Sequence, residues 1–120
     1  LVKIMERHIN GTITNNYSGG IDVGSYDFSD FMYDFANDVG FAKHHNKGLG
    51  GKKAFIENCN IRMYFTDKEC DLDEAEIALL MKLEVKGDVK ECTIGGHNLI
   101  NILCDHIGKY VNIVVEAEEM

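Results

Sequence analysis

The first candidate for a functional surface is a row of carboxylates. Asp27, Asp30, Asp34 and Asp38 follow one another at intervals of three, four and four, which places them along one flank of a helix. Such a row mimics the spacing of nucleic-acid phosphates and favours docking on a basic partner. A solvated helix face, with Asp27 near the positive amino end of the helix, explains the same pattern. Both interpretations stay open.

Basic residues gather in one glycine-rich segment, residues 42–53, which holds Lys43, Lys47, Lys52 and Lys53. Glycine-rich backbone can surround an anion with its N–H groups, and lysines neutralise the charge. Lys52 and Lys53 are therefore candidate ligand-binding residues, whereas a plain exposed loop is the alternative. The stretch GLGGKK lacks the spacing and the closing Ser or Thr of a Walker loop.

A third candidate combines a strand with a turn. Arg62 and Tyr64 are two residues apart on a predicted strand and therefore share one of its faces, where a guanidinium beside an aromatic ring could clamp a phosphate and stack a base. Pairing of Arg62 with an acid across the sheet is the alternative, and so acidic a chain favours it. A predicted strand-to-helix turn presents backbone N–H groups that suit an anion, unless Asn98 or His97 merely caps the helix. The candidate residues of this turn are Thr93, Gly95, Gly96, His97 and Asn98.

Residues that would indicate an enzyme or a metal site do not come together in the sequence. Neither GxSxG nor HExxH is present. The four cysteines, Cys59, Cys70, Cys92 and Cys104, have 10, 21 and 11 residues between them, so none forms the close pair of a zinc knuckle. We therefore expect buried, reduced thiols, no metal, no cofactor and no catalytic activity.

The elements that must position these residues follow from hydrophobic spacing and turn signals. Asn10-Gly11 predicts a hairpin between strands 2–9 and 12–17, followed by a loop over 18–25. Helices are expected over 28–39, 72–86 and 97–107, and strands over 60–65, 88–94 and 110–117, the last at the centre of the sheet. Asp27 is the expected N-cap of the first helix and Gly40 its stop. Apolar residues surround helix 72–86, so we expect cover on two sides, the second from another subunit.

The predicted fold class is thus α+β, with one mixed sheet of about five strands and three helices in the order ββ-α-β-α-β-α-β. With 120 residues, of which 45% are hydrophobic, the chain is expected to form one domain, 1–120, without internal repeats. No apolar run is long enough to span a membrane, and the first residues are unlike a secretion signal, which predicts a cytosolic protein. A net charge of −8 argues against direct nucleic-acid binding.

Residues 60–116 resemble a known protein family in the layout of two stretches. The stretches IRMYFTDKECDLDEAEIALLMKL and TIGGHNLINILCDHIGKYVNIVVE are similar in layout to the phage sponge family that defeats Thoeris defence by sequestering cyclic ADP-ribose signals. The resemblance implies a homo-oligomeric, non-enzymatic protein in the host cell cytosol. It would hold a small cyclic nucleotide near Arg62 and the turn at 93–98. Such a sponge is expected to have further arginines near the last strand, where this chain has Lys109 and Asn112.

The alternative comes from the carboxylate row. Asp27, Asp30, Asp34 and Asp38 would then make the chain an acidic, anti-CRISPR-like inhibitor that docks on a nucleic-acid-binding effector of the host defence. The two hypotheses differ in the partner, a small cyclic nucleotide or a host defence protein. They differ also in the surface that binds it.

Overall fold

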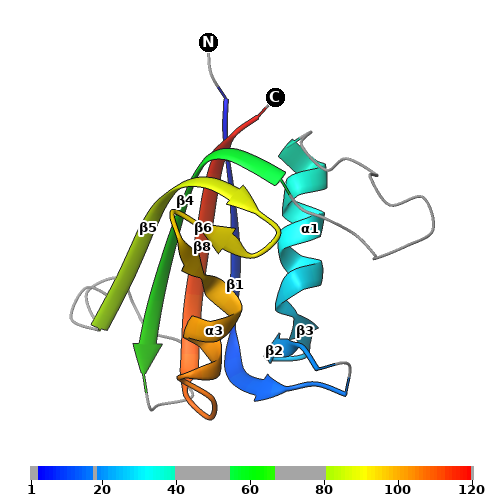
Figure 1. Cartoon of the computed structure of the whole chain (residues 1–120), viewed down its shortest axis with the longest axis vertical. Helices are drawn as coiled ribbons and strands as arrows, with labels where there is room; N and C mark the ends of the chain where they lie inside the picture. Colours follow the sequence, from blue (N-terminus) through cyan, green and yellow to red (C-terminus); the bar gives the residue numbers. More distant parts are fainter. Residues whose placement is uncertain (1–2, 18, 40–54, 67–80, 120) are drawn as a thin grey trace.

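The computed structural model describes residues 3–17, 19–39, 55–66 and 81–119 (Figure 1). Within these ranges the chain forms one antiparallel sheet and two helices, with strand order β3-β2-β1-β8-β4-β5-β6-β7. The long strands are β1 (Ile4–Asn15), β4 (Phe55–Thr66), β5 (Met81–Lys90) and β8 (Tyr110–Glu118). The short ones are β2 (Ile21–Val23), β3 (Tyr26–Asp27), β6 (Thr93–Ile94) and β7 (His97–Asn98). The helices are α1 (Phe28–Val39) and α3 (Leu99–Cys104).

This architecture corrects the predicted fold class. The described residues form eight strands and two helices, where a mixed sheet of about five strands with three helices was expected. Every strand pairing in the described sheet is antiparallel. The main causes are a predicted helix whose described part, residues 81–86, belongs to a strand, and four very short strands that hydrophobic periodicity does not reveal.

Helix α1 and strand β8 confirm two of the predictions. Helix α1 has the predicted bounds and buries Phe28, Met32, Phe35 and Val39 on one face. The N-cap is also as predicted, because the Asp27 carboxylate accepts a hydrogen bond of 3.0 Å from the backbone N–H of Asp30. Strand β8 lies between β1 and β4 at the centre of the sheet.

The predicted hairpin at Asn10-Gly11 is wrong. Strand β1 continues through both residues, which pair with Asn112 and Val111 of β8. Gly11 has φ +153°, and a Cβ added to it would lie 2.4 Å from the Cα of Gly24. The glycine is therefore required for close approach of two backbone segments and not for a chain reversal.

The predicted helix 72–86 is also wrong over the part that the structure describes. Residues Met81 to Lys86 belong to β5 and pair with β4, while residues 72–80 lie outside the described ranges. Val85 is buried and Leu83 half-buried, whereas Glu84 and Lys86 are exposed. Leu83 and Val85, which contributed to the expected two-sided cover of that helix, thus lie on the core face of a strand.

Three further boundaries differ from expectation. The predicted strand 88–94 is divided between β5 and β6 by a turn in which Glu91 has φ +60°. The predicted helix 97–107 is shorter, because its first two residues form β7 and α3 ends at Cys104. The expected loop 18–25 contains strand β2, whose Ile21 and Val23 side chains are buried.

The two halves of the described fold follow the same plan, although no internal repeat was predicted. The elements β1-β2-β3-α1-β4 correspond to β5-β6-β7-α3-β8, and each long first strand is followed by a short hairpin that leads into a helix. The sheet order reads the same under exchange of the halves, so a pseudo-twofold axis passes between β4 and β8. The registers put this axis at the pair formed by Arg62 and Val114.

Corresponding positions in the halves share conformation and burial. Gly11 and Gly87 both have positive φ, +153° and +145°, as do Gly24 and Gly95 at +65° and +54°. The helix caps correspond too, because Asn98 accepts a 3.2 Å hydrogen bond from the backbone N–H of Asn101 as Asp27 does from that of Asp30. In the two helices, the fully buried equivalent pairs include Phe28 with Leu99 and Met32 with Leu103. The described fold therefore has an internal pseudo-twofold repeat whose two halves differ in sequence.

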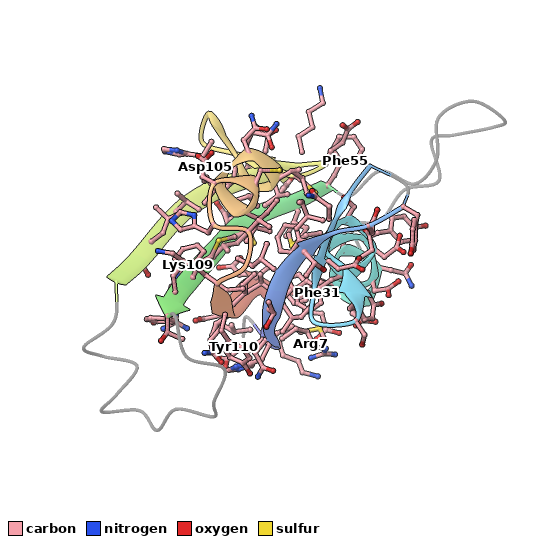
Figure 2. All side chains as sticks on the ribbon, turned by 90° about the horizontal axis from the view of Figure 1, so that it is seen from below. Arg7, Phe31, Phe55, Asp105, Lys109 and Tyr110 are labelled. Carbon is pink, nitrogen blue, oxygen red and sulfur yellow. The ribbon has the colours of Figure 1, made fainter. Side chains whose placement is uncertain are left out.

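The core lies between one face of the sheet and both helices. Ile61, Met63, Ile113 and Val115 point from the central strands into the same buried cluster as the apolar residues of α1 and α3. Figure 2 shows side chains filling this space, with Phe31 at α1 and Asp105 beyond the end of α3. Among the described residues, neither helix is long and apolar enough to cross a membrane.

Candidate binding face

The opposite face of the sheet, which we call the outer face, is predominantly polar. It consists of the residues that alternate with the core positions along the four long strands. The middle of the outer face includes Glu6, His8 and Asn10 of β1, Asn112, Val114 and Glu116 of β8, Asn60, Arg62 and Tyr64 of β4, and Glu84 and Lys86 of β5. The outer face thus brings together Arg62 and Tyr64, as the sequence predicted from their spacing on one strand.

Arg62 occupies the middle of the outer face, opposite Val114 on β8 and Glu84 on β5. Its guanidinium donates a hydrogen bond to the carboxylate of Glu116, and each of the two side chains is 28% exposed. This is the ion pair across the sheet that the sequence favoured over a phosphate clamp. The charge of Arg62 is therefore largely compensated within the chain.

Two asparagines flank Arg62 and are related by the pseudo-twofold axis. Asn60 lies on β4 opposite Glu116, and Asn112 lies on β8 opposite Tyr64. The Asn60 amide donates a hydrogen bond of 3.3 Å to the carboxylate of Glu84. Because asparagine is depleted in strands, its presence at equivalent positions of the two central strands favours a use other than sheet formation.

Three buried polar atoms on this face have no hydrogen-bond partner among the described residues. They are Asn60 Oδ1, Arg62 Nε and Asn112 Nδ2. A buried donor or acceptor that loses its water without gaining a partner costs about 1–3 kcal/mol. The two central strands therefore carry a set of unpaired donors and acceptors close to the pseudo-twofold axis.

A recess with a volume of 340 Å³ lies at the same part of the sheet, where a bulge interrupts the register of β4 and β5. Asn58, Asn60, Lys86 and Gly87 line it together with the buried Cys59. Asn58 has φ +52°, and its backbone N–H donates to the carboxylate of Asp88 at 3.1 Å. The recess adds amides and one ammonium group beside the outer face.

The structure does not bring the turn at 93–98 to Arg62. Strand β6 pairs with Val89 and Lys90 of β5, whereas Arg62 lies opposite Glu84. Five to six residues of an extended strand separate these positions by about 17–20 Å. Thr93, Gly95, Gly96, His97 and Asn98 are all exposed, and Asn98 serves as the N-cap of α3. Lys52 and Lys53 lie outside the described residues.

The carboxylate row of α1 is partly engaged in contacts of its own. Besides capping α1, Asp27 accepts a 2.6 Å hydrogen bond from the side-chain amide of Asn16. Asp34 accepts a hydrogen bond from the hydroxyl of Tyr26, which raises the pKa of Tyr26 to about 12. Asp38 lies 3.5 Å from the guanidinium of Arg7, whose position at β1 is labelled in Figure 2. Asp30, Asp34 and Asp38 are exposed.

The described cysteines are free thiols, as predicted, but they are not all buried. Burial raises the pKa of Cys59 to about 12, and it also raises the pKa of the half-buried Cys92. A thiol with a raised pKa is a poor nucleophile at neutral pH, because little thiolate is present. Cys104 is exposed, contrary to expectation, and Cys70 lies outside the described residues. In the described part of the chain, no three His, Cys, Asp or Glu side chains are placed to hold a metal ion.

The sequence did not single out Asn60, Asn112 or Glu116 as site residues. A usable signal was present for Asn112, which interrupts the Val- and Ile-rich run of the predicted strand 110–117. Comparison of the chain with protein-family models, curated proteins and solved structures finds no match.

Proposed function

We propose that this chain is a non-enzymatic binding protein that holds a small ligand on the outer face of its sheet. The observation that carries the proposal is that Asn60, Arg62, Tyr64 and Asn112 share one polar face of the two central strands. Three of their polar atoms are buried without a partner among the described residues, so a ligand would reach them only after the side chains turn, and the hydrogen bonds that it then supplies would offset their desolvation cost.

In its specific form, the proposal is a phage-type anti-defence protein that sequesters a cyclic-nucleotide immune signal in the host cell cytosol, as a homo-oligomer. The resemblance of residues 60–116 to the Thoeris sponge family motivates the ligand class. Arg62 and Tyr64 support it, because a guanidinium and a phenol ring lie on one face beside the two asparagines. The turn at 93–98 would belong to a separate contact, since it lies at the end of the sheet.

Isothermal titration calorimetry with a panel of cyclic nucleotides tests this proposal. We expect micromolar or tighter binding of at least one of them, with affinity reduced about tenfold or more by Arg62→Ala, because a hydrogen bond to a charged group contributes about 1.5–3 kcal/mol. Arg7→Ala is the matched control, since Arg7 also pairs with a carboxylate but lies on the helix side of the sheet. No heat with any cyclic nucleotide would refute the specific form.

A second candidate function keeps the carboxylate row as the binding surface. The exposed carboxylates of Asp30, Asp34 and Asp38 favour an acidic inhibitor that docks on a nucleic-acid-binding effector. Competition between this chain and DNA for CRISPR effector nucleases tests it. Asp30→Lys combined with Asp34→Lys should abolish competition, and competition by the unaltered chain should weaken steeply with salt. Competition that does not change with salt would exclude this candidate.

A further inference from the structure

The amino-terminal part of strand β1 has a free backbone edge. Strand β8 pairs with one side of β1 from Ile4 to Thr12, whereas β2 pairs with the other side only from Ile13 onward. Among the residues that the structure describes, no strand pairs with that second side between Ile4 and Asn10. The unpaired side of a strand presents backbone N–H and C=O groups to which another strand can be added.

The hydrogen bonds of β1 show which of its residues present these groups. In an antiparallel strand, both backbone groups of a residue point to the same side, and successive residues alternate between the two sides. The Lys3 carbonyl, at 2.7 Å, and both backbone groups of Ile13, at 2.9 Å, bond to segments at the two ends of β8. The Thr12 carbonyl instead accepts a 3.0 Å hydrogen bond from the turn between β2 and β3, on the other side. The residues that direct their backbone groups to the free edge are therefore Ile4, Glu6 and His8.

The side chains of this edge are accessible and complementary in charge. The side chains of Glu6 and His8 are 47% and 60% exposed, and they contact each other within the chain. The Glu6 carbonyl accepts a 2.9 Å hydrogen bond from the guanidinium of its neighbour Arg7, a surface contact that an added strand would replace. Edge strands that carry charges of one sign keep other strands away, whereas an acid and a base on one edge can pair with their own copies.

One register brings these groups together when β1 pairs antiparallel with the β1 strand of a second copy. Residues opposite each other must lie on the same face of the sheet. With Arg7 on the twofold axis, Glu6 lies opposite His8 of the second copy, and His8 lies opposite its Glu6. With Glu6 or His8 on the axis, two carboxylates or two imidazoles would lie opposite each other, and like charges in that position are destabilising. The charge pattern therefore selects the register centred on Arg7.

The helix side of β1 suits the same register. Met5 and Ile9 are half-buried beside the core, and each would lie opposite the other residue of the second copy, which extends the apolar contact across the axis. The two copies of Arg7 would meet, but each guanidinium lies 3.5 Å from the Asp38 carboxylate of its own chain, which compensates the charge. The turn between β2 and β3 approaches the Asn10 carbonyl, so the paired stretch ends before that residue.

We propose that a second copy of this chain pairs with the free edge of β1, antiparallel and centred on Arg7, so that two sheets join into one. Each pair of Glu6 with His8 would exchange both of its backbone hydrogen bonds. The outer faces of the two copies would lie on the same side of the joined sheet. This inference goes beyond the proposed function, because the contact needs no ligand. It gives the homo-oligomer of that proposal a defined interface.

Sedimentation velocity of the full chain without any nucleotide tests the inference, at protein concentrations up to about 0.3 mM. We expect a reversible dimer whose share increases with concentration. His8→Pro should raise its dissociation constant about tenfold or more, because proline has no N–H to donate across the axis. The N–H of His8 points away from β8, so this variant loses no hydrogen bond of the single chain.

Two charge variants made separately identify the register. Glu6→Lys and His8→Glu should each weaken self-association about tenfold, because each removes the attraction between opposite residues. An equimolar mixture of the two variants should associate again, because opposite charges then face each other in the mixed pair. Glu57→Lys is the matched control, since Glu57 is an exposed residue of β4 outside this edge, and it should leave the dissociation constant unchanged.

A single-chain mass at every concentration would overturn the inference. A dimer that survives His8→Pro and both charge variants, or a mixture that associates no better than its components, would overturn it too. Circular dichroism checks that each variant folds, and the charge variants decide the question if His8→Pro does not fold. Nucleotide binding by a chain that stays single would overturn this interface and leave ligand binding on the outer face standing. Dimers that bind no cyclic nucleotide would have the opposite meaning.

Discussion

Replacement of Asn112 by threonine should stabilise the fold, and the size of the effect can be worked out from the structure. Asn112 is half-buried in the central strand β8, and its Nδ2 atom is buried without a partner in the described chain. Removing that atom recovers about 1–3 kcal/mol of desolvation, and the higher strand propensity of threonine contributes up to about 1 kcal/mol. The threonine hydroxyl needs a partner of its own and offsets part of this gain. We expect a net increase of about 1–3 kcal/mol in the free energy of unfolding.

Thermal and urea unfolding followed by circular dichroism measure this change. For a chain of this length, about 1 kcal/mol corresponds to roughly 4 °C, so Tm should rise by about 4–12 °C. Asn15→Thr is the control, because Asn15 is exposed on β1 and its replacement should change stability by less than about 0.5 kcal/mol. A lower Tm for Asn112→Thr, or a rise no larger than that of the control, would show that Asn112 is held by contacts of the fold itself.

Three other predictions concern the scaffold. Gly11→Ala should lower the free energy of unfolding by more than about 3 kcal/mol, because the added Cβ would lie 2.4 Å from the Gly24 backbone. Gly87→Ala should lower it by only about 1–2 kcal/mol, the strain of its positive φ, and equal urea midpoints for the two variants would contradict this difference. The pKa of Cys59 is raised to about 12 in the fold, so between about pH 9 and pH 12 the folded state keeps a proton that the unfolded chain has lost, and the free energy of unfolding falls as the pH rises. The urea midpoint should therefore be lower at pH 10.5 than at pH 8, and equal midpoints would contradict this. Asp27→Ala should lower the free energy of unfolding by about 1 kcal/mol through loss of the α1 cap, and an unchanged midpoint would argue against that cap.

The parts of the fold that sequence reasoning predicted are those with strong local signals. Helix α1 combines an N-cap at Asp27 with apolar residues at helical spacing, so both its existence and its bounds were predictable. Strand β8 is rich in Val and Ile and was predicted at the centre of the sheet, where it lies. The pairing of Arg62 with an acid was favoured from the charge balance alone, and Glu116 supplies that acid.

The remaining parts depend on contacts that are distant in the sequence. Asn10-Gly11 has the composition of a hairpin turn, but the glycine is fixed by the approach of Gly24 from another strand. Residues 81–86 fit both a helix covered on two sides and an alternating strand, and pairing with β4 decides for the strand. The internal repeat has no clear signal in the sequence, because the halves share glycines, caps and core positions at equivalent places in the fold while most of their residue types differ.

The candidate site was predictable only in part for the same reason. Arg62 and Tyr64 are two residues apart on one strand, so their shared face followed from the sequence. The alignment of Asn60 with Glu116 and of Tyr64 with Asn112 requires the register of β4 against β8, which no local pattern reveals. The turn at 93–98 was grouped with Arg62 because no sequence signal indicated how far along β5 it would lie.

The central claim is that the outer face of the sheet holds a small ligand. Native mass spectrometry of the intact chain, incubated with a panel of cyclic nucleotides, measures this most directly and reports the number of subunits in the same experiment. The account predicts a mass increase equal to one of the nucleotides, which Asn60→Thr removes and Asn15→Thr retains. An adduct that persists undiminished in Asn60→Thr, or its absence with every nucleotide of the panel, would contradict it.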